Sequence, residues 1–453
     1  MGVYVFIAVF CSSIVGAQVL GISLNKLALL PLEVYLLIHN GRDLQFKVNQ
    51  TQRKLLLWYI VACVSSFSGI LFSQFYNANI IDEMFSRTIL DVTSYLLILT
   101  PIALLVWNSK KQEKYYHCFK KAFITTCRIQ ALWGIAQFVL WYTIGFDLNS
   151  EVLSAVFGGS WTGYSNLANS SGGVLLRVTG INHDSAFLGL LLVIGILLDK
   201  KTIFRLVYLF CAVFSSSRAA LGSIGFIIIF QLAVRLRRNQ TFKLKRTIKY
   251  ILVILGLVFV CAYIYQKFPQ VQIQVTRVIE RFATIATGED GTGRHTGYPI
   301  AVAYLELFEI PIIQKLFGVG NQCGGILMSY FQDSIKWLDL TGGMRDLSSV
   351  WTVESDLASV FLETGIIGGV LYYRFLYSIY KSAQGDNVKQ CLVATLAFFG
   401  IMYNMAGGAF IQLAYIFLYV PDNSISDSRE VFNYERANKR ISGKRIFNRG
   451  KLL

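Results

Sequence analysis

The segment VESDLASVFLETGIIG, residues 353–368, decides the fold of this chain. It begins with two carboxylates around a serine, continues as an apolar run, and returns the chain from polar to membrane-like sequence. The polar stretch that it closes extends from about 268 to 356 and interrupts a near-continuous series of apolar segments. The same stretch contains GTGRHTG at residues 291–297. We therefore expect membrane helices that hold one large polar segment at the bilayer surface.

The composition is typical of a polytopic membrane protein. Of the 453 residues, 54% are hydrophobic and 15% are charged, and the mean hydropathy is +0.52. A soluble domain carries roughly 25% charged residues. Apolar stretches of about 18 residues or more indicate membrane spans, and they recur from end to end. We expect an all-α fold with about twelve transmembrane helices, at 3–21, 23–39, 55–75, 88–108, 122–144, 184–199, 202–217, 219–234, 249–267, 357–380, 390–407 and 408–420.

Three local patterns refine this expectation. Residues 3–39 are short for two full crossings, so one of those two segments is expected to be re-entrant or broken, and Pro31 lies within it. In the long polar segment, apolar residues at helical spacing predict a short helix over Tyr298–Phe308, followed by Pro311. Gly318-Val319-Gly320-Asn321 predicts a turn.

The basic residues indicate the orientation. The net charge is +16, but Lys and Arg fall mainly in short loops between apolar segments, which is the positive-inside bias and argues against nucleic-acid binding. The basic loops at 42–54, 110–121, 200–205 and 235–249 are expected in the cytoplasm with both termini, and the loops 76–87, 145–183, 215–218 and 268–356 then face outward. The chain divides into membrane helices over 1–267, the long outer loop 268–356, membrane helices over 357–420, and a basic cytoplasmic tail 421–453 that anionic lipid attracts.

Several chemistries find no support. The 8 cysteines are scattered without metal-ligand spacing, and only Cys323 lies in the long loop, so no structural disulfide is expected there. The chain has no phosphate-binding Gly-x-x-x-x-Gly-Lys loop, no His-Glu-x-x-His and no Gly-x-Ser-x-Gly elbow. The sequence therefore does not predict ATP-driven transport, zinc proteolysis or serine hydrolysis.

Three arginines on the outward side are the first candidate site residues. Arg177 precedes a span, Arg218 lies at a turn between two spans, and Arg294 lies in the glycine-flanked stretch of the long loop. An interfacial arginine often only reaches lipid phosphate. A guanidinium, however, binds phosphate bidentately and stays charged at every relevant pH. Clustered, the three would suit a pyrophosphate-linked lipid, and His183 and His295 beside them could bind phosphate or act as a base.

Two carboxylates at the end of the long loop are the candidate acids and bases. Glu354 and Asp356 immediately precede a span. A glycosyl transfer needs a group that takes the proton from the attacking hydroxyl, and burial beside a membrane would raise the pKa of a carboxyl toward a useful range. The alternatives are acids that complement a helix dipole, or oxygen ligands for a divalent metal. The chain has no Asp-x-Asp triplet, which argues against a metal-dependent transferase.

Aromatic and glycine residues supply weaker signals. Aromatic side chains of the outer loops could stack against sugar faces or belong to the interfacial aromatic belt, and these are Trp161, Tyr164, Trp337 and Trp351. Gly365-Ile366-Ile367-Gly368-Gly369 is typical of close helix packing.

Three motifs occur in order over about residues 177–369. They are Arg177-x-x-Gly180 followed by Asn182 and a span, the turn Ser215-Ser216-Ser217-Arg218, and a long loop with a Gly-Arg294 element, the Gly318-Val319-Gly320 turn and a terminal Glu363-x-Gly365-Ile-Ile-Gly368. Together they resemble the O-antigen polymerase and O-antigen ligase superfamily of bacterial inner-membrane polysaccharide enzymes. Ligases typically place a histidine nine residues before the glutamate at the Glu363 position, where this chain has Glu354. The resemblance therefore favours a polymerase.

The resemblance implies a membrane glycosyltransferase (GT-C-like) fold and a reaction on the periplasmic face. The donor would be a glycan on undecaprenyl pyrophosphate, and the acceptor would be the terminal sugar of a new lipid-linked repeat unit. Glu354 would be the base, with Asp356 or His295 as substitutes, and the three arginines would hold pyrophosphate. No metal, nucleotide or other cofactor is expected. Membrane lipid, a flippase and a chain-length regulator are the expected partners.

Two rival functions remain open at this point. A ligase would transfer the same donor to a lipid A core, and only the acceptor distinguishes it. A lipid-linked oligosaccharide flippase should carry charges along a central cavity within its spans. The predicted intramembrane charges are few, namely Glu33, Asp91 and Arg128, whereas the candidate residues gather on one face, which favours an enzyme.

Overall fold

The chain is described here from a computed structural model. The described residues are 1–15, 17–19, 22–43, 47–72, 78–157, 167–170, 173–237, 310–321, 323–324 and 355–418, with single positions between 266 and 308. The predicted span 249–267, almost all of the predicted helix Tyr298–Phe308 and the basic tail lie outside them.

The described chain is mostly helical. Its first half forms α1 (Gly2–Ser12), β1 (Gln18–Val19), β2 (Ile22–Ser23), α2 (Leu24–Leu27), α3 (Leu29–Asn40), η1 (Gly41–Asp43), α4 (Gln50–Phe72), α5 (Ala78–Asp91), the π-helix η3 (Val92–Leu99), α6 (Thr100–Trp107) and α7 (Gln112–Ile144). Its second half forms η4 (Asn149–Leu153), α8 (Ser154–Phe157), β3 (Leu167–Ser170), β4 (Gly173–Leu176), α9 (Ser185–Leu198), α10 (Thr202–Phe214), α11 (Arg218–Arg237), α15 (Ile312–Phe317), α18 (Asp356–Ser382), α19 (Asn387–Met402) and α20 (Ala409–Leu418).

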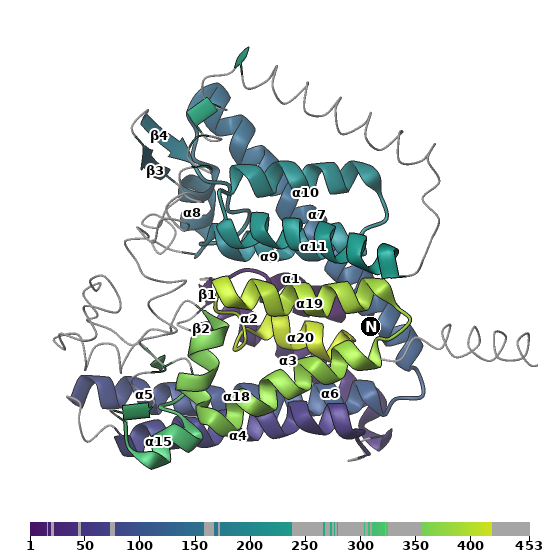
Figure 1. Ribbon diagram of the computed structural model, residues 1–453, viewed down its shortest axis with the longest axis vertical. Coiled ribbons are helices and arrows are strands. Elements are labelled where there is room, and N and C mark those ends of the chain that lie inside the picture. The colour runs from purple at the N-terminus through teal and green to yellow at the C-terminus, as the bar shows by residue number, and fades with distance from the viewer. Residues whose placement is uncertain are drawn as a thin grey trace, which may run out of the picture.

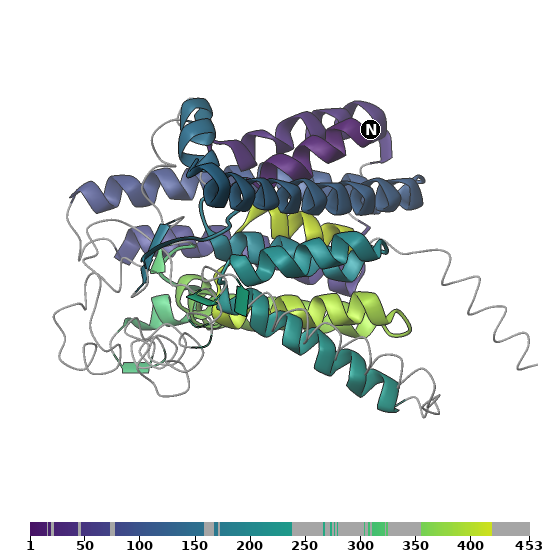
Figure 2. The ribbon, with the colours of Figure 1, turned by 90° about the horizontal axis from the view of Figure 1, so that it is seen from above.

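The long helices share one general direction and form three groups (Figures 1 and 2). Helices α7, α9, α10 and α11 make one group, and α4, α5, α6 and α18 make another, with α15 beside them. Between them lie α1, α2, α3, α19 and α20. Helix α18 packs along α4, and α19 packs against α11. The two strand pairs are short antiparallel hairpins, with Val19 opposite Ile22 and Ser170 opposite Gly173.

The lengths of the helices support the prediction of membrane spans. Within the described residues, three helices are long and apolar enough to cross a bilayer, at Gln50–Leu71, Met84–Trp107 and Gln112–Ile144. Shorter apolar helices of 10–17 residues include α1, α9, α10 and α19. The prediction of a helical membrane protein is confirmed at this level.

The first predicted pair of spans takes a broken form. Helix α1 has 11 residues, about 17 Å at 1.5 Å per residue, against a hydrocarbon core about 30 Å thick. The chain then turns through the β1–β2 hairpin and the four-residue α2 before α3 begins. Pro31 lies in the first turn of α3, where the missing amide hydrogen costs no helical hydrogen bond. The hairpin, not the proline, interrupts the apolar segment.

Local signals explain where several helices begin and end. The Asp184 side chain accepts a hydrogen bond from the Ala186 amide at the start of α9, and the Asp386 side chain accepts from Val388 and Lys389 at the start of α19. Helix α7 ends at Gly145, whose φ of 69° is left-handed. These are the expected amino-terminal and carboxyl-terminal caps.

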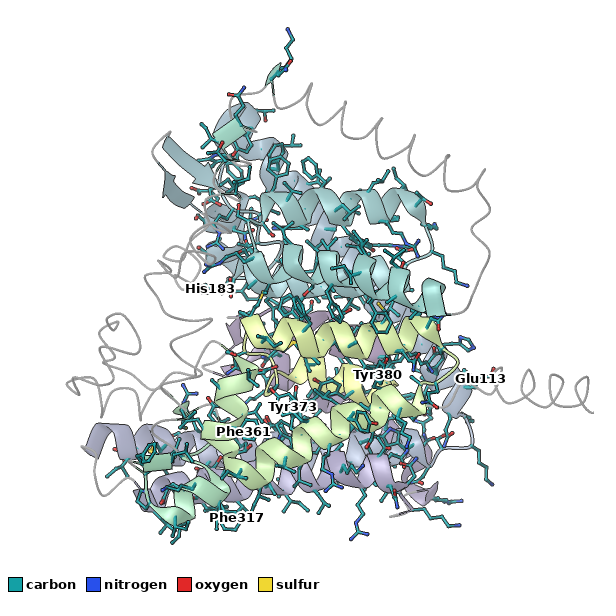
Figure 3. All side chains as sticks on the ribbon, in the orientation of Figure 1. Glu113, His183, Phe317, Phe361, Tyr373 and Tyr380 are labelled. Carbon is teal, nitrogen blue, oxygen red and sulfur yellow. The ribbon has the colours of Figure 1, made fainter. Side chains whose placement is uncertain are left out.

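The two ends of the helix bundle can be named by labelled residues. His183 precedes α9 at one end, and Glu113 lies in the first turn of α7 at the opposite end (Figure 3). We call them the His183 end and the Glu113 end. The turn between α9 and α10 at the Glu113 end holds an ion pair, in which Arg128 donates to both carboxylate oxygens of Asp199 over 2.7 and 2.9 Å. Arg128, predicted as an intramembrane charge, is thus neutralised within the protein.

Candidate functional site

Four of the predicted site residues are described: Arg177, His183, Arg218 and Asp356. Arg177 and His183 lie in the loop between β4 and α9, Arg218 is the first residue of α11, and Asp356 is the first residue of α18. The other predicted site residues lie outside the described residues, and these are Trp161, Tyr164, Arg294, His295, Trp351 and Glu354.

Buried glutamines of α7 shape the loop that carries Arg177. The Gln137 Oε1 atom accepts hydrogen bonds from the Thr179 and Gly180 amides over 3.2 and 2.8 Å, and Gln130 Oε1 accepts from the Ile181 amide over 2.8 Å. Gly180 has a φ of +66°, and a Cβ there would lie 2.7 Å from Gln130 Oε1. Because of this backbone conformation and this close approach, only glycine fits at position 180.

Asn182 continues the same frame toward the amino terminus of the chain. Its Oδ1 accepts from the Val15 amide over 3.1 Å, and its Nδ2 donates to Gln130 Oε1 over 3.2 Å. The Gly and Asn positions of the Arg177 motif therefore hold the backbone, while Arg177 is half-buried and donates to the Ser185 hydroxyl.

The Arg177 loop contacts the serine turn directly. The Val178 amide donates to the Phe214 carbonyl over 3.1 Å, which places the residue after Arg177 against the end of α10. Within the turn, the Ser217 hydroxyl accepts from the Ala220 amide over 3.3 Å and so caps α11. Ser215, Ser216 and Ser217 are buried, whereas Arg218 is half-buried.

Helix α9 lies close to the same turn because it carries a glycine there. A Cβ on Gly189 would lie 2.6 Å from the Ala220 Cβ and 3.1 Å from the Ser217 hydroxyl. Two segments that are distant in the sequence, the Arg177 loop and the Ser-Arg218 turn, are therefore joined at the His183 end (Figure 3). The basic turn Asp199–Lys201 and the first turn of α7 lie at the Glu113 end.

Asp356 is a buried carboxyl that holds a neighbouring turn. It precedes the predicted span 357–380 and is 2% exposed. Its Oδ1 accepts from the Met405 and Ala406 amides over 2.8 and 2.9 Å, whereas its buried Oδ2 has no hydrogen-bond partner among the described residues. Burial raises the pKa of Asp356 to about 7, although the two amide hydrogen bonds oppose this shift.

The end of α19 lies between Asp356 and the helix that carries Arg218. A Cβ on Gly400 would lie 2.7 Å from Asp356 Oδ2, and the Ser355 hydroxyl donates to the Ile401 carbonyl over 2.8 Å. On its other side, α19 approaches Gly222, one turn after Arg218, with Met402. Arg218 and Asp356 thus flank the same helix end.

Three glycines fix the 318–321 turn of the long loop against α18. Gly318, Gly320 and Gly365 all have positive φ, and the Val319 and Gly320 amides donate to the Leu362 and Glu363 carbonyls over 3.1 and 3.2 Å. The predicted turn at 318–321 is confirmed. Gly365 is the point at which α18 bends, while Gly368 approaches Val61 of α4 in the close packing expected from the sequence.

Sequence reasoning missed Lys26 and the surroundings of Asp91. Lys26 lies in α2, is half-buried and interacts electrostatically with Asp91, which is 4% exposed. Both lie inside predicted spans, where averaging of hydropathy conceals single charges. A lone lysine and a lone aspartate in apolar segments were the available signal.

Within the described ranges, no group of three or more His, Cys, Asp or Glu side chains could hold a metal ion. No protein-family model matches the chain, and no curated protein matches its sequence.

Proposed function

We propose that this protein is a surface-polysaccharide polymerase of the O-antigen type, a multi-pass enzyme of the bacterial inner membrane. In this proposal the fold is of the GT-C-like membrane glycosyltransferase type with about twelve spans, and the His183 end faces the periplasm. The enzyme transfers a growing glycan from undecaprenyl pyrophosphate to the terminal sugar of a new lipid-linked repeat unit.

One observation carries the proposal most directly. The Arg177 loop and the Ser-Arg218 turn meet through the Val178–Phe214 hydrogen bond at the end of the bundle opposite the basic turns. Two guanidinium groups are thus presented from one frame of buried amides and serines. Fixed cations are the groups that stabilise charge on a departing pyrophosphate.

The family resemblance implies the proposed reaction, in which Arg294 and Glu354 lie outside the described residues. The acceptor hydroxyl forms a bond to the anomeric carbon of the donor glycan, and the bond from that carbon to the pyrophosphate oxygen breaks. Undecaprenyl pyrophosphate leaves with the electron pair, and Arg177, Arg218 and Arg294 compensate its charge. Glu354 takes the proton from the hydroxyl, while Asp356, two residues later, anchors the start of α18 on the turn before α20.

The buried charges of the bundle give less support to a transporter. Arg128 is neutralised by Asp199, and Asp91 accepts from the Ser66 hydroxyl over 2.9 Å. Charges that are compensated inside the protein do not line an open path for a glycan.

Replacement of the arginines tests the site. Arg177→Ala and Arg218→Ala should each abolish long-chain polysaccharide while the protein stays in the membrane, because each removes a charge that faces the leaving group. Arg42→Ala, which changes an exposed arginine on the predicted cytoplasmic side, is the matched control and should keep wild-type chain lengths. Gel analysis of extracted polysaccharide and immunoblots of membranes provide the measurement. Wild-type chains in the Arg218→Ala strain would remove Arg218 from the site.

The acceptor decides between polymerase and ligase. Purified protein supplied with lipid-linked repeat units alone should lengthen them, and Glu354→Gln should stop the reaction. Transfer only when a lipid A core is added would identify a ligase instead.

A further inference from the structure

The turn at 318–321 is held by helices of the first half of the chain. A Cβ on Gly69 of α4 would lie 2.1 Å from the Val319 carbonyl oxygen, so α4 and the turn are in backbone contact. The Gln314 side chain donates to the Ser68 carbonyl over 3.4 Å. On the opposite side, the turn bonds to Leu362 and Glu363 of α18. The 318–321 turn of the long loop is therefore enclosed between α4 and α18.

Asn321, the last residue of this turn, enters a buried polar cluster. It is 3% exposed, and its Nδ2 donates to the Tyr95 hydroxyl over 3.3 Å. Its side chain also interacts with the Asp91 carboxylate and favours the charged form of that group. Asp91 accepts from Ser66 of α4 over 2.9 Å and is compensated electrostatically by Lys26 and Arg87. The Asn321 side chain of the long loop thus interacts with two buried side chains, Asp91 of α5 and Tyr95 of η3.

The same cluster reaches the turn that binds Asp356. The Tyr95 hydroxyl donates to the Gly407 carbonyl over 3.3 Å. Gly407 follows Met405 and Ala406, whose amides donate to Asp356 Oδ1. A connected set of contacts therefore leads from Asp91 through Asn321 and Tyr95 to Gly407, next to the two residues that hold the start of α18.

Simple packing does not account for this arrangement. An apolar side chain at position 91 would pack between helices without the desolvation cost of a carboxylate. Asp91 instead stands at the junction of α5 with a π-helix, and π-helical turns frequently occur at functional sites. The wide turn brings Tyr95 beside Trp58 and Tyr59, with ring centroids 5.7 and 5.2 Å away.

We propose that Asp91, Tyr95 and Asn321 form a tether, a set of positioning residues that fixes the 318–321 turn, in the middle of the long loop, relative to Asp356. Its catalytic consequence rests on the proposed function, because Glu354 is joined to Asp356 through one residue. The tether itself is independent of which reaction the protein catalyses.

An exchange of the two partners tests the tether without an activity assay. Asn321→Asp places two carboxylates together, and Asp91→Asn leaves Lys26 without its counter-charge. The double variant Asp91→Asn/Asn321→Asp restores one carboxylate and one amide. Hydrogen exchange of the Val319 and Gly320 amides in detergent should be accelerated about tenfold or more in each single variant, the effect of losing about one charged hydrogen bond. The double variant should recover most of the protection.

Two controls keep this test decisive. Thr93→Ala changes a half-buried side chain on the same helix, whose exposed hydrogen bond goes to the Ile89 carbonyl, and should leave exchange at positions 319 and 320 unchanged. Protection of the buried part of α7 in the same samples shows that a variant is folded. Should a single variant fail that criterion, Tyr95→Phe removes only the hydroxyl and should still accelerate exchange. Unchanged amide protection in the single variants would overturn the proposal. So would a double variant in which the effects of the two single substitutions on hydrogen exchange simply add.

The activity readout separates this proposal from the proposed function. In the polymerisation assay the single variants should lower the rate of chain extension, and the exchanged pair should restore it. If the double variant recovers amide protection but the wild-type protein shows no polymerase activity, the tether is supported and the proposed function is refuted. Normal polymerisation in variants whose Val319 and Gly320 amides have lost their protection from hydrogen exchange would refute the positioning role.

Discussion

At the scale of single residues, Asp356 shows how one carboxyl can have two different environments. Its Oδ1 satisfies two backbone amides, and its Oδ2 is buried beside Gly400 without a hydrogen-bond donor. A carboxylate in this position is charged at a site with few compensating donors, so the folded protein favours the protonated form.

This environment predicts a pH-dependent stability. The pKa of Asp356 in the folded protein is about 7, above its ordinary value of about 4. The folded state therefore binds one more proton than the unfolded state between these values, and stability should fall as pH rises, by at most about 1.4 kcal/mol per pH unit. Asp356→Asn should remove this part of the slope. Unfolding temperatures in detergent at pH 5 to 8 measure it, and parallel curves for the two proteins would contradict the assignment.

Gln137 is the residue on which the Arg177 loop most depends. It accepts from two buried amides of that loop. Gln137→Leu should leave both amides unsatisfied, which costs about 1–3 kcal/mol for each buried group, and should displace Arg177. Leu132→Ala, at an exposed position of the same helix, is the matched control. A lowered unfolding temperature and lost polysaccharide are expected only for Gln137→Leu, and equal behaviour of the two variants would argue against the frame.

At the scale of elements, the bend of α18 is locked against the 318–321 turn. A Cβ on Gly365 would lie 2.3 Å from the Leu316 carbonyl oxygen, and one on Gly318 would lie 2.1 Å from the Glu363 carbonyl oxygen. A side chain on either glycine would collide with the backbone of the other segment, and both glycines have positive φ. The bend and the turn therefore form as one unit.

Gly365→Ala should disrupt this unit. Left-handed backbone strain costs about 1–3 kcal/mol, and the carbonyl contact adds to it, so a strong fall in unfolding temperature is expected. Gly225→Ala is the control, because a Cβ there meets no atom within 4 Å. Thermal unfolding followed by tryptophan fluorescence compares the two. Equal unfolding temperatures would show that the bend tolerates a side chain.

The elements themselves were largely predictable, with specific exceptions. The predicted span 184–199 matches α9 at Ser185–Leu198 because an apolar run and the Asp184 cap both mark it. The span predicted over 122–144 is α7, which begins ten residues earlier at Gln112. Hydropathy detects apolar sequence, and the charged first turns of α7 are helical without being apolar.

The site was predictable in its residues and not in its connections. Arg177 and Arg218 stood out because they oppose the charge bias of the loops. Their junction depends on a bond between Val178 and Phe214 and on two glutamines of α7. Such pairs are distant in the sequence, and a lone glutamine in an apolar helix has no local signature. Asp91 and Asn321 were noticed separately, and their contact was missed for the same reason.

At the scale of the whole molecule, the bundle has two unlike ends. Arg177, Arg218 and Asp356 lie around the turns at the His183 end, whereas the Arg128–Asp199 pair and the first turn of α7 mark the Glu113 end. This asymmetry is the expected pattern for a protein that works on one side of a membrane.

Reporter fusions test that asymmetry. Alkaline phosphatase fused at about Ser160 or Gly325 should be active, because it requires the periplasm, and a fusion at about Lys200 should be inactive. A cytoplasmic fluorescent reporter should give the reverse result. Inactive phosphatase at both outer positions would place the arginines in the cytosol and remove the basis of the proposed function.

The enclosure of the 318–321 turn between α4 and α18 also has a consequence for biosynthesis. Helix α4 is made early, and α18 is among the last helices to leave the ribosome. In the proposed topology, the turn can settle only after it has been exported across the membrane, and the bend of α18 can close only onto a turn that has settled. Maturation of the protein therefore depends on translocation of the large loop, so a stalled export step should leave α18, α19 and α20 open to degradation while α7 and α9 are already assembled.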